Sequence, residues 1–283
     1  MRDSVLVIAL SALTICSGTN WGNAPRKVQV GYCAALSELE ATKAAGFEYA
    51  ELRTAEVAAL SEADYEKLAG KVKQLGIPVP VTNYFIPASI KVTGPAIDQA
   101  KQMEYVKQAF DRVSRLGVGI IVFGSGGARQ VPDGFSKPEA FEQLVEFCRR
   151  IAPEAKAHKL TIAIEPLRKE ECNIINTAGE GLALVEAVHD PNIQLMVDFY
   201  HLAVEREDPQ IIIKAKDHLR HLHMANPEGR VFPLKWEEYD YAKFFENLRK
   251  IGYDRRISVE AQAKDFQKEA PLSIALLRRA FRQ

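Results

Sequence analysis

Segments with β-strand character alternate with amphipathic helical patterns eight times along this chain of 283 residues. Strict alternation of this kind predicts parallel strands joined by right-handed helical crossovers. Eight such units match the usual size of a closed barrel, which is about 250 residues. An open, doubly wound sheet is the alternative, but no Gly-x-Gly-x-x-Gly turn follows the first strand. The sequence therefore predicts an α/β protein with a single (β/α)8 TIM barrel over residues 28–283, preceded by a short N-terminal leader.

The expected elements can be given by their residue ranges, and no linker divides them into two domains. The expected strands cover residues 28–34, 49–53, 79–86, 119–124, 161–167, 193–201, 219–226 and 256–262. The expected helices cover residues 38–45, 62–75, 97–116, 138–158, 179–188, 209–218, 241–251 and 269–282. Glycines at positions such as Gly46, Gly76 and Gly117 support these boundaries, because glycine is common just beyond a helix C-terminus.

Residues 1–27 differ from the rest of the chain. Arg2 precedes an apolar run from Val5 to Cys16, and the small residues Ser17 and Gly18 follow it. The run is too short to span a bilayer and is typical of a secretory signal peptide. We expect a cleaved leader and a periplasmic or secreted mature protein with no membrane association. A buried leading helix in a cytoplasmic protein is the alternative.

The composition excludes some classes of protein. The chain has 37 Lys and Arg against 37 Asp and Glu, so its net charge is +0. A nucleic-acid-binding protein would be expected to carry a basic surface, so no nucleic-acid partner is predicted. The four cysteines have no Cys-x-x-Cys spacing, which argues against a structural zinc site and a disulfide framework.

Coordinating side chains stand at the ends of four late strands. They are Glu165, Asp198, the pair His221 and His223, and Glu260. In a (β/α)8 enzyme the C-terminal ends of the strands form the active site. Three converging carboxylates would repel one another without a cation, and this mixture of oxygen and imidazole ligands suits Mn²⁺, Mg²⁺ or Co²⁺, with Zn²⁺ also acceptable. In the alternative, these residues pair with arginines instead; the candidates are Arg53, Arg168, Arg220 and Arg256.

The order of residues within the late strands predicts which face is polar. Ala163 and Glu165 share one face of their strand, while the neighbouring isoleucines share the other. His221 and His223 likewise share a face, opposite Leu222. Large aliphatic side chains would pack on the helices, so the polar faces are expected to point into the barrel.

These strand ends carry a resemblance that covers the chain after residue 27. The segments Ile164-Glu-Pro-Leu167, Val197-Asp-Phe-Tyr-His201, His221-Leu-His223 and Val259-Glu260 resemble the sugar (phosphate) isomerase/epimerase family. That family has the xylose isomerase-like TIM barrel and includes ketose 3-epimerases and hydroxypyruvate isomerases. The resemblance implies an enzyme of carbohydrate metabolism with a small-molecule carbohydrate as its partner. It is also compatible with a homo-oligomer.

The resemblance assigns roles to individual residues. It implies that one divalent ion, with Mn²⁺ as the first choice, is bound by Glu165, Asp198, His223 and Glu260. It favours His223 over His221, which would lie one layer deeper in the barrel.

The substrate side of the pocket follows from the same resemblance. It implies that the substrate contacts Glu171, His201 and Arg230. Two departures concern this side: Arg168 stands where many relatives have Asn, and Arg230 is one residue further from its histidine than in ketose 3-epimerases.

The expected activity is isomerisation or epimerisation of a sugar or keto-sugar. A base removes a proton next to a carbonyl, and a metal stabilises the resulting enediolate as a Lewis acid. Glu165 and Glu260 are the expected catalytic pair. Transfer on opposite faces gives an epimer, and transfer on one face gives an aldose–ketose isomer. A metal-dependent lyase acting on 3-keto-glycosides and a non-catalytic sugar-binding barrel are the alternatives.

Overall fold

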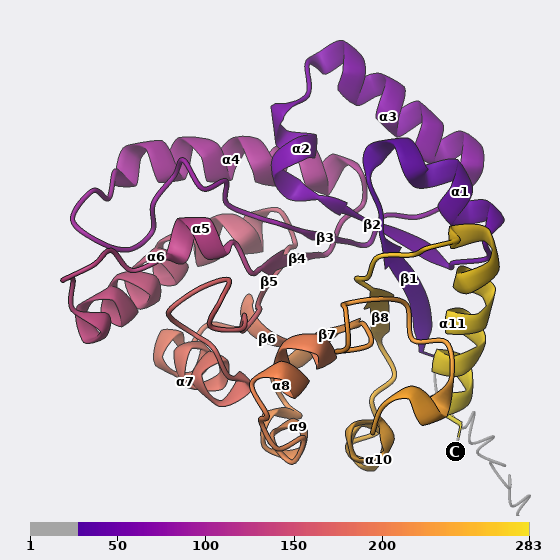
Figure 1. The fold of residues 1–283 in the computed structure, drawn as a ribbon. Coiled ribbons are helices and arrows are strands. Elements are labelled where there is room, and N and C mark those ends of the chain that lie inside the picture. Colours follow the sequence, from indigo (N-terminus) through magenta and orange to yellow (C-terminus); the bar gives the residue numbers. More distant parts are fainter. Residues whose placement is uncertain (1–27, 283) are drawn as a thin grey trace, which may run out of the picture.

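The computed structural model describes residues 28–282, so the expected leader, residues 1–27, lies outside the described residues. Eight parallel strands form a closed barrel in sequential order, and β1 pairs with β8 to complete the ring (Figure 1). This closure confirms the barrel and excludes the open sheet. The strands are β1 (Gln29–Cys33), β2 (Tyr49–Arg53), β3 (Val81–Asn83), β4 (Ile120–Phe123), β5 (Thr161–Ile164), β6 (Ile193–Asp198), β7 (Leu219–Met224) and β8 (Arg256–Val259).

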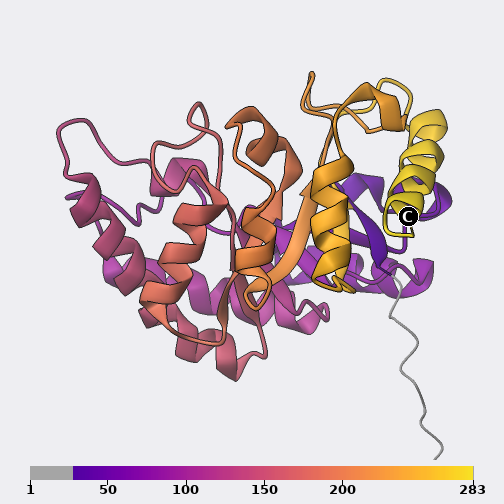
Figure 2. The same cartoon turned by 90° about the horizontal axis from the view of Figure 1, so that it is seen from below.

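Helices surround the barrel, and Figure 2 shows them alongside the strands. Those expected from the sequence are α1 (Leu39–Ala44), α3 (Glu62–Leu75), α4 (Gln99–Arg115), α6 (Lys137–Ala157), α7 (Ala178–Val188), α9 (Ile211–Ala215), α10 (Ala242–Lys250) and α11 (Phe266–Ala280). Short elements that were not expected are α2 (Thr54–Ala59), α5 (Gly126–Arg129), α8 (Phe199–Val204), η1 (Leu36–Glu38) and η2 (Trp236–Glu238). No helix within residues 28–282 is long and apolar enough to cross a membrane.

The sixth strand ends earlier than its apolar pattern predicted. The expected strand 193–201 stops at Asp198, and helix α8 begins at the next residue. The Asp198 carboxylate accepts the backbone N–H of Tyr200 at 2.8 Å, which is the usual way an aspartate starts a helix. Asp198 therefore ends the strand and turns the chain, so that His201 returns over the mouth of the barrel.

The apolar core has two layers. A small cluster fills the inside of the barrel: Tyr49, Val81, Val122, Ala163 and Met196. The larger core lies between strands and helices and includes Ile162, Ile164 and Leu222, as their alternation predicted. The Tyr49 ring needs Gly31 beside it, because a Cβ atom at Gly31 would lie 2.2 Å from Cε2 of Tyr49.

Candidate metal centre and substrate pocket

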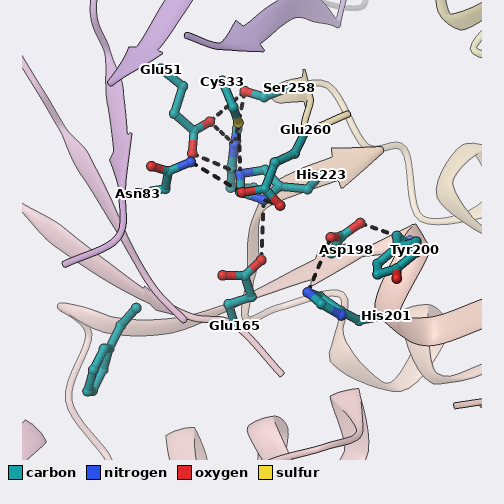
Figure 3. A network of polar contacts seen from close by, with 12 residues as sticks. Cys33, Glu51, Asn83, Glu165, Asp198, Tyr200, His201, His223, Ser258 and Glu260 are labelled. Carbon is teal, nitrogen blue, oxygen red and sulfur yellow. Dashed lines mark hydrogen bonds and ion pairs between the residues drawn. The ribbon is translucent and has the colours of Figure 1, made fainter. Parts of the chain in front are cut away.

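The structure brings four of the predicted strand-end residues together at the C-terminal mouth of the barrel (Figure 3). Glu165, Asp198, His223 and Glu260 each offer one ligand atom, and these atoms all lie within 4.8 Å of one another. Glu165 and Glu260 directly follow β5 and β8, while Asp198 and His223 lie within β6 and β7. The parallel order of the strands is what places side chains so distant in the sequence around one point.

The buried atoms of this cluster fit a divalent cation. Nδ1 of His223, Oε1 of Glu165 and Oδ2 of Asp198 are all buried without a hydrogen-bond partner among the described residues. The His223 Nδ1 atom lies 3.3 Å from Oε1 of Glu165 and 3.5 Å from Oε2 of Glu260. Buried polar atoms without partners are costly, and a cation would satisfy all of them at once. The donor set matches the oxygen-rich ligation that Mn²⁺ and Mg²⁺ prefer.

A residue that the sequence analysis did not assign supports His223 from below. The carboxylate of Glu51, on β2, is fully buried and lies 2.8 Å from Nε2 of His223 through Oε1. It also lies 2.8 Å from Nε2 of His221 through Oε2. Burial alone would lower the pKa of His223, but the neighbouring carboxylates raise it well above its ordinary value, so without a cation the ring favours its protonated form. With a cation bound, the Nε2 proton would stay in the contact with Glu51 and the Nδ1 lone pair would face the cluster. Carboxylates commonly fix metal-binding histidines in this way.

The deeper layer completes this network. Ser258 donates its hydroxyl proton to Oε2 of Glu51 at 2.5 Å, and the hydroxyl of Tyr49 lies 2.8 Å from that of Ser258. Burial lowers the pKa of His221, and this effect is larger than the opposite effect of the Glu51 carboxylate, so the neutral form of the ring is favoured. His221 therefore lies one layer below the cluster, as expected. The inward position of Glu51 could have been predicted from the sequence, because Glu51 is two residues from Tyr49 and so lies on the same face of the strand.

The electrostatics of the three carboxyl groups differ. Burial, followed by the charge of Glu260, raises the pKa of Asp198 to about 7. Burial likewise raises the pKa of Glu165 above its ordinary value. Burial would also raise the pKa of Glu260, but His223 and Arg230 outweigh it and lower this pKa to about 2. Asp198 and Glu165 thus hold their protons more tightly than usual, because they are buried close to the negative charge of Glu260.

Arg230 and Glu171, two of the predicted substrate residues, meet at the edge of the cluster. The Arg230 guanidinium lies 2.6 Å from Oε2 of Glu260 and 3.0 Å from Oε1 of Glu171. It also lies over the ring of Tyr200, 4.6 Å from the centroid. Arg168 binds Glu171 at 2.8 Å from the other side. None of the four arginines considered from the sequence contacts the cluster, since Arg53 binds Glu56 and the others bind elsewhere. The alternative pairing with these four arginines is therefore wrong, although Glu260 does pair with another arginine, Arg230.

His201 is buried beside the cluster. Its Nδ1 accepts the backbone N–H of Arg168 at 3.2 Å, and its Nε2 lies 3.6 Å from Oδ2 of Asp198. Burial, followed by the charge of Arg230, lowers the pKa of His201 to about 3. A neutral ring that accepts at Nδ1 carries its proton on Nε2. His201 therefore presents an N–H donor beside the carboxylates.

A pocket of about 690 Å³ opens above these residues. Glu165, Glu171, Arg230 and Glu260 line its inner part. Pockets of about 300–1,000 Å³ are typical of small-molecule sites. Two of the predicted metal-binding residues and two of the predicted substrate-binding residues therefore share one cavity, while Asp198, His201 and His223 are buried and do not line it.

Residues 39–280 match the sequence model of the family described as xylose isomerase-like TIM barrel. This chain belongs to that family. An L-ribulose 3-epimerase of Mesorhizobium japonicum is 28% identical over 249 residues, which are 83% of this chain and 80% of the relative. An L-ribulose 3-epimerase of Methylomonas sp. is 32% identical over 174 residues, which are 60% of this chain and 58% of the relative.

The barrel also resembles solved structures in its fold. A crystal structure of a D-psicose 3-epimerase in the presence of D-fructose superposes with a TM-score of 0.79. The match covers 90% of this chain and 99% of the other chain at 20% identity. At this identity the similarity shows the fold alone. Fold and family thus agree with the resemblance that the strand-end motifs indicated.

Proposed function

We propose that this protein is a divalent-metal-dependent epimerase of keto-sugars. The observation that carries the proposal is the approach of two carboxylates to the same imidazole nitrogen. Glu165 reaches it from the end of β5 and Glu260 from the end of β8, three strands further round the ring. The relatives named L-ribulose 3-epimerase and D-psicose 3-epimerase support the substrate class.

Glu165, Asp198, His223 and Glu260 would hold the metal ion, for which Mn²⁺ is the first choice. When bound, the ion supplies Lewis-acid polarisation of the substrate carbonyl and offsets the negative charge of the enediolate. The orphaned lone pairs of the cluster support this assignment. The polar side chains of Asn83, Glu171 and Gln262 in the pocket wall can form hydrogen bonds to sugar hydroxyl groups.

The protein groups transfer the protons. One of the two glutamates removes the proton next to the carbonyl, and the other, in its protonated form, returns a proton to the opposite face of the same carbon. Transfer from the two faces inverts that carbon, which is epimerisation. Arg230 holds the Glu260 carboxylate in place through its 2.6 Å contact. We assign the Nε2–H of His201 and the Glu171 carboxylate to the binding of sugar hydroxyl groups.

The experiment is a conversion assay with metal removal. The purified protein is incubated with D-fructose, D-psicose and L-ribulose, with added Mn²⁺ or with EDTA, and the products are separated by chromatography. We expect the C3 epimer of at least one ketose with Mn²⁺ and none with EDTA. An aldose product would instead show isomerisation. Absence of any conversion with Mn²⁺ present would contradict the proposal.

A further inference from the structure

Tyr84 stands at the mouth of the pocket with its side chain largely in solvent. The residue is 53% exposed and directly follows β3. It lines the same cavity as Glu165 and Glu260. Its neighbour Asn83 reaches the cluster, with Nδ2 lying 3.5 Å from Oε1 of Glu260. A large aromatic side chain therefore lines the cavity that contains the reacting groups and is not packed into the core of the protein.

The backbone at Tyr84 is held in an unfavourable conformation. Its φ angle is 49°, in the left-handed region that bulky residues rarely adopt. The surrounding hydrogen bonds fix this segment: Ala55 N–H donates to the Tyr84 carbonyl at 3.3 Å, and Ile86 N–H donates to Oγ of Ser125 at 2.8 Å. The Tyr105 hydroxyl donates to the Phe85 carbonyl at 2.5 Å. Backbone strain that neighbours maintain is concentrated at functional sites.

The Tyr84 ring also has a fixed neighbour. The Arg53 guanidinium lies 5.7 Å from the ring centroid and is itself held by Glu56 at 3.0 Å. This contact orients the ring at the pocket mouth. Arg53 and Gln262 are also exposed residues that line the cavity, and both can offer hydrogen bonds. An oriented aromatic face flanked by hydrogen-bonding groups is complementary to a sugar ring, whose C–H face is apolar and whose edge carries hydroxyls.

The size of the cavity agrees with a ligand of more than one ring. Its volume is about 690 Å³, in the range of pockets that enclose drug-sized ligands, and a single hexose is smaller than these. Glu165 and Glu260, which would carry out the chemistry, are more buried than Arg53 and Tyr84, which line the same cavity.

We propose that Tyr84 and Arg53 form an outer subsite for a second sugar ring, so that the substrate is a glycosylated keto-sugar. The proposal rests on the proposed function for the position of the reacting ring. That ring lies at Glu165 and Glu260, and the attached ring stacks on Tyr84.

The test uses three probes that share one ketose unit: D-fructose, its galactosylated form lactulose and its glucosylated form isomaltulose. Calorimetry with Mn²⁺ present gives their dissociation constants, and NMR in deuterated solvent gives the rate of C–H exchange. The proteins are the wild type, Tyr84→Ala, Tyr84→Phe, which keeps the ring, and Leu272→Ala. Leu272 is equally exposed at 53% but lies on α11, away from the pocket.

We expect the wild type to bind at least one disaccharide more tightly than D-fructose. Tyr84→Ala should raise the dissociation constant for that disaccharide by roughly 3- to 10-fold, which is the range expected for loss of an aromatic contact. The dissociation constant for D-fructose should be unchanged. Tyr84→Phe and Leu272→Ala should behave as the wild type.

C–H exchange on D-fructose, with neither disaccharide bound more tightly than D-fructose, would contradict the outer subsite. The proposed function would still hold. An equal effect of Tyr84→Ala on all three sugars would also overturn the subsite. Disaccharide binding that depends on Tyr84, with no C–H exchange on any probe, would support the subsite and contradict the proposed function.

Discussion

Glu51 Oε1 and His223 Nε2 lie 2.8 Å apart inside the barrel, although 172 positions separate the two residues in the sequence. The contact connects β2 to β7 across the interior and leaves Nδ1 of His223 directed at the carboxylate cluster. Glu51 therefore sets which imidazole nitrogen is available to a metal ion.

Replacing Glu51 with Gln should weaken metal binding without removing a ligand. The amide offers one acceptor oxygen where the carboxylate offers two, so His221 and His223 no longer both find an acceptor. Loss of such a supporting carboxylate commonly costs about 10–100-fold in metal affinity. Calorimetric titration with Mn²⁺ measures it. Glu48→Gln is the matched control, because Glu48 binds Arg278 away from the site. An unchanged affinity in folded Glu51→Gln would refute the supporting role.

The choice between the two histidines can be tested by substitution and by metal removal. His223→Ala should abolish binding of the ion, whereas His221→Ala should retain it with reduced affinity. In the wild type, Mn²⁺ at 100 times its dissociation constant should add about 2.7 kcal/mol of stability, which EDTA reverses. Thermal unfolding with and without Mn²⁺ reports both effects. Loss of the Mn²⁺ shift in His221→Ala alone would assign the ligand to His221.

Metal affinity should depend on pH through Asp198. The pKa of this carboxyl is raised to about 7, chiefly by burial, so below that pH a proton occupies the site that the cation needs. The pKa values of Glu165 and His223 are raised as well, so these ligands also release protons to the cation. Affinity should therefore fall as the pH drops below about 7, by at least about tenfold per unit, and titration with Mn²⁺ between pH 5.5 and 8 measures this slope. A flat profile would show that Asp198 is ionised without the metal.

Gly124 should be required for the position of Glu165. A Cβ atom at Gly124 would lie 2.1 Å from Oε2 of Glu165, so Gly124→Ala must displace this carboxylate. We expect the conversion rate to fall by at least tenfold, since small misplacements of catalytic groups are costly. Gly119→Ala is the control: its Cβ would come no closer than 4.0 Å to the Pro80 carbonyl oxygen. Equal activity in the two variants would argue against the tight fit around Glu165.

The late strands could be predicted well because apolar and polar residues alternate along them and a charged or histidine residue stands at the end of each. Ala163 and Glu165 are two residues apart, so a strand conformation directs them to the same face. In the structure both side chains point into the barrel. The role of Glu51 could not be predicted from the sequence, because it depends on contacts with His221 and His223 that form only when the barrel closes. The contact between Arg230 and Glu260 depends on a loop in which Arg230 has a φ of 51°, which no periodic pattern encodes.

The central claim is that Glu165 and Glu260 transfer the protons, and solvent exchange tests it most directly. The ketose that the wild type converts is incubated in deuterated water with Mn²⁺, and NMR follows deuterium at the carbon next to the carbonyl. Glu165→Gln and Glu260→Gln keep an oxygen ligand of similar size but lack a group that can cycle a proton. With metal binding confirmed by calorimetry, we predict that exchange falls by about 10²–10⁴-fold in each variant. Exchange at the wild-type rate in both variants would contradict the account and leave the two glutamates as metal ligands alone.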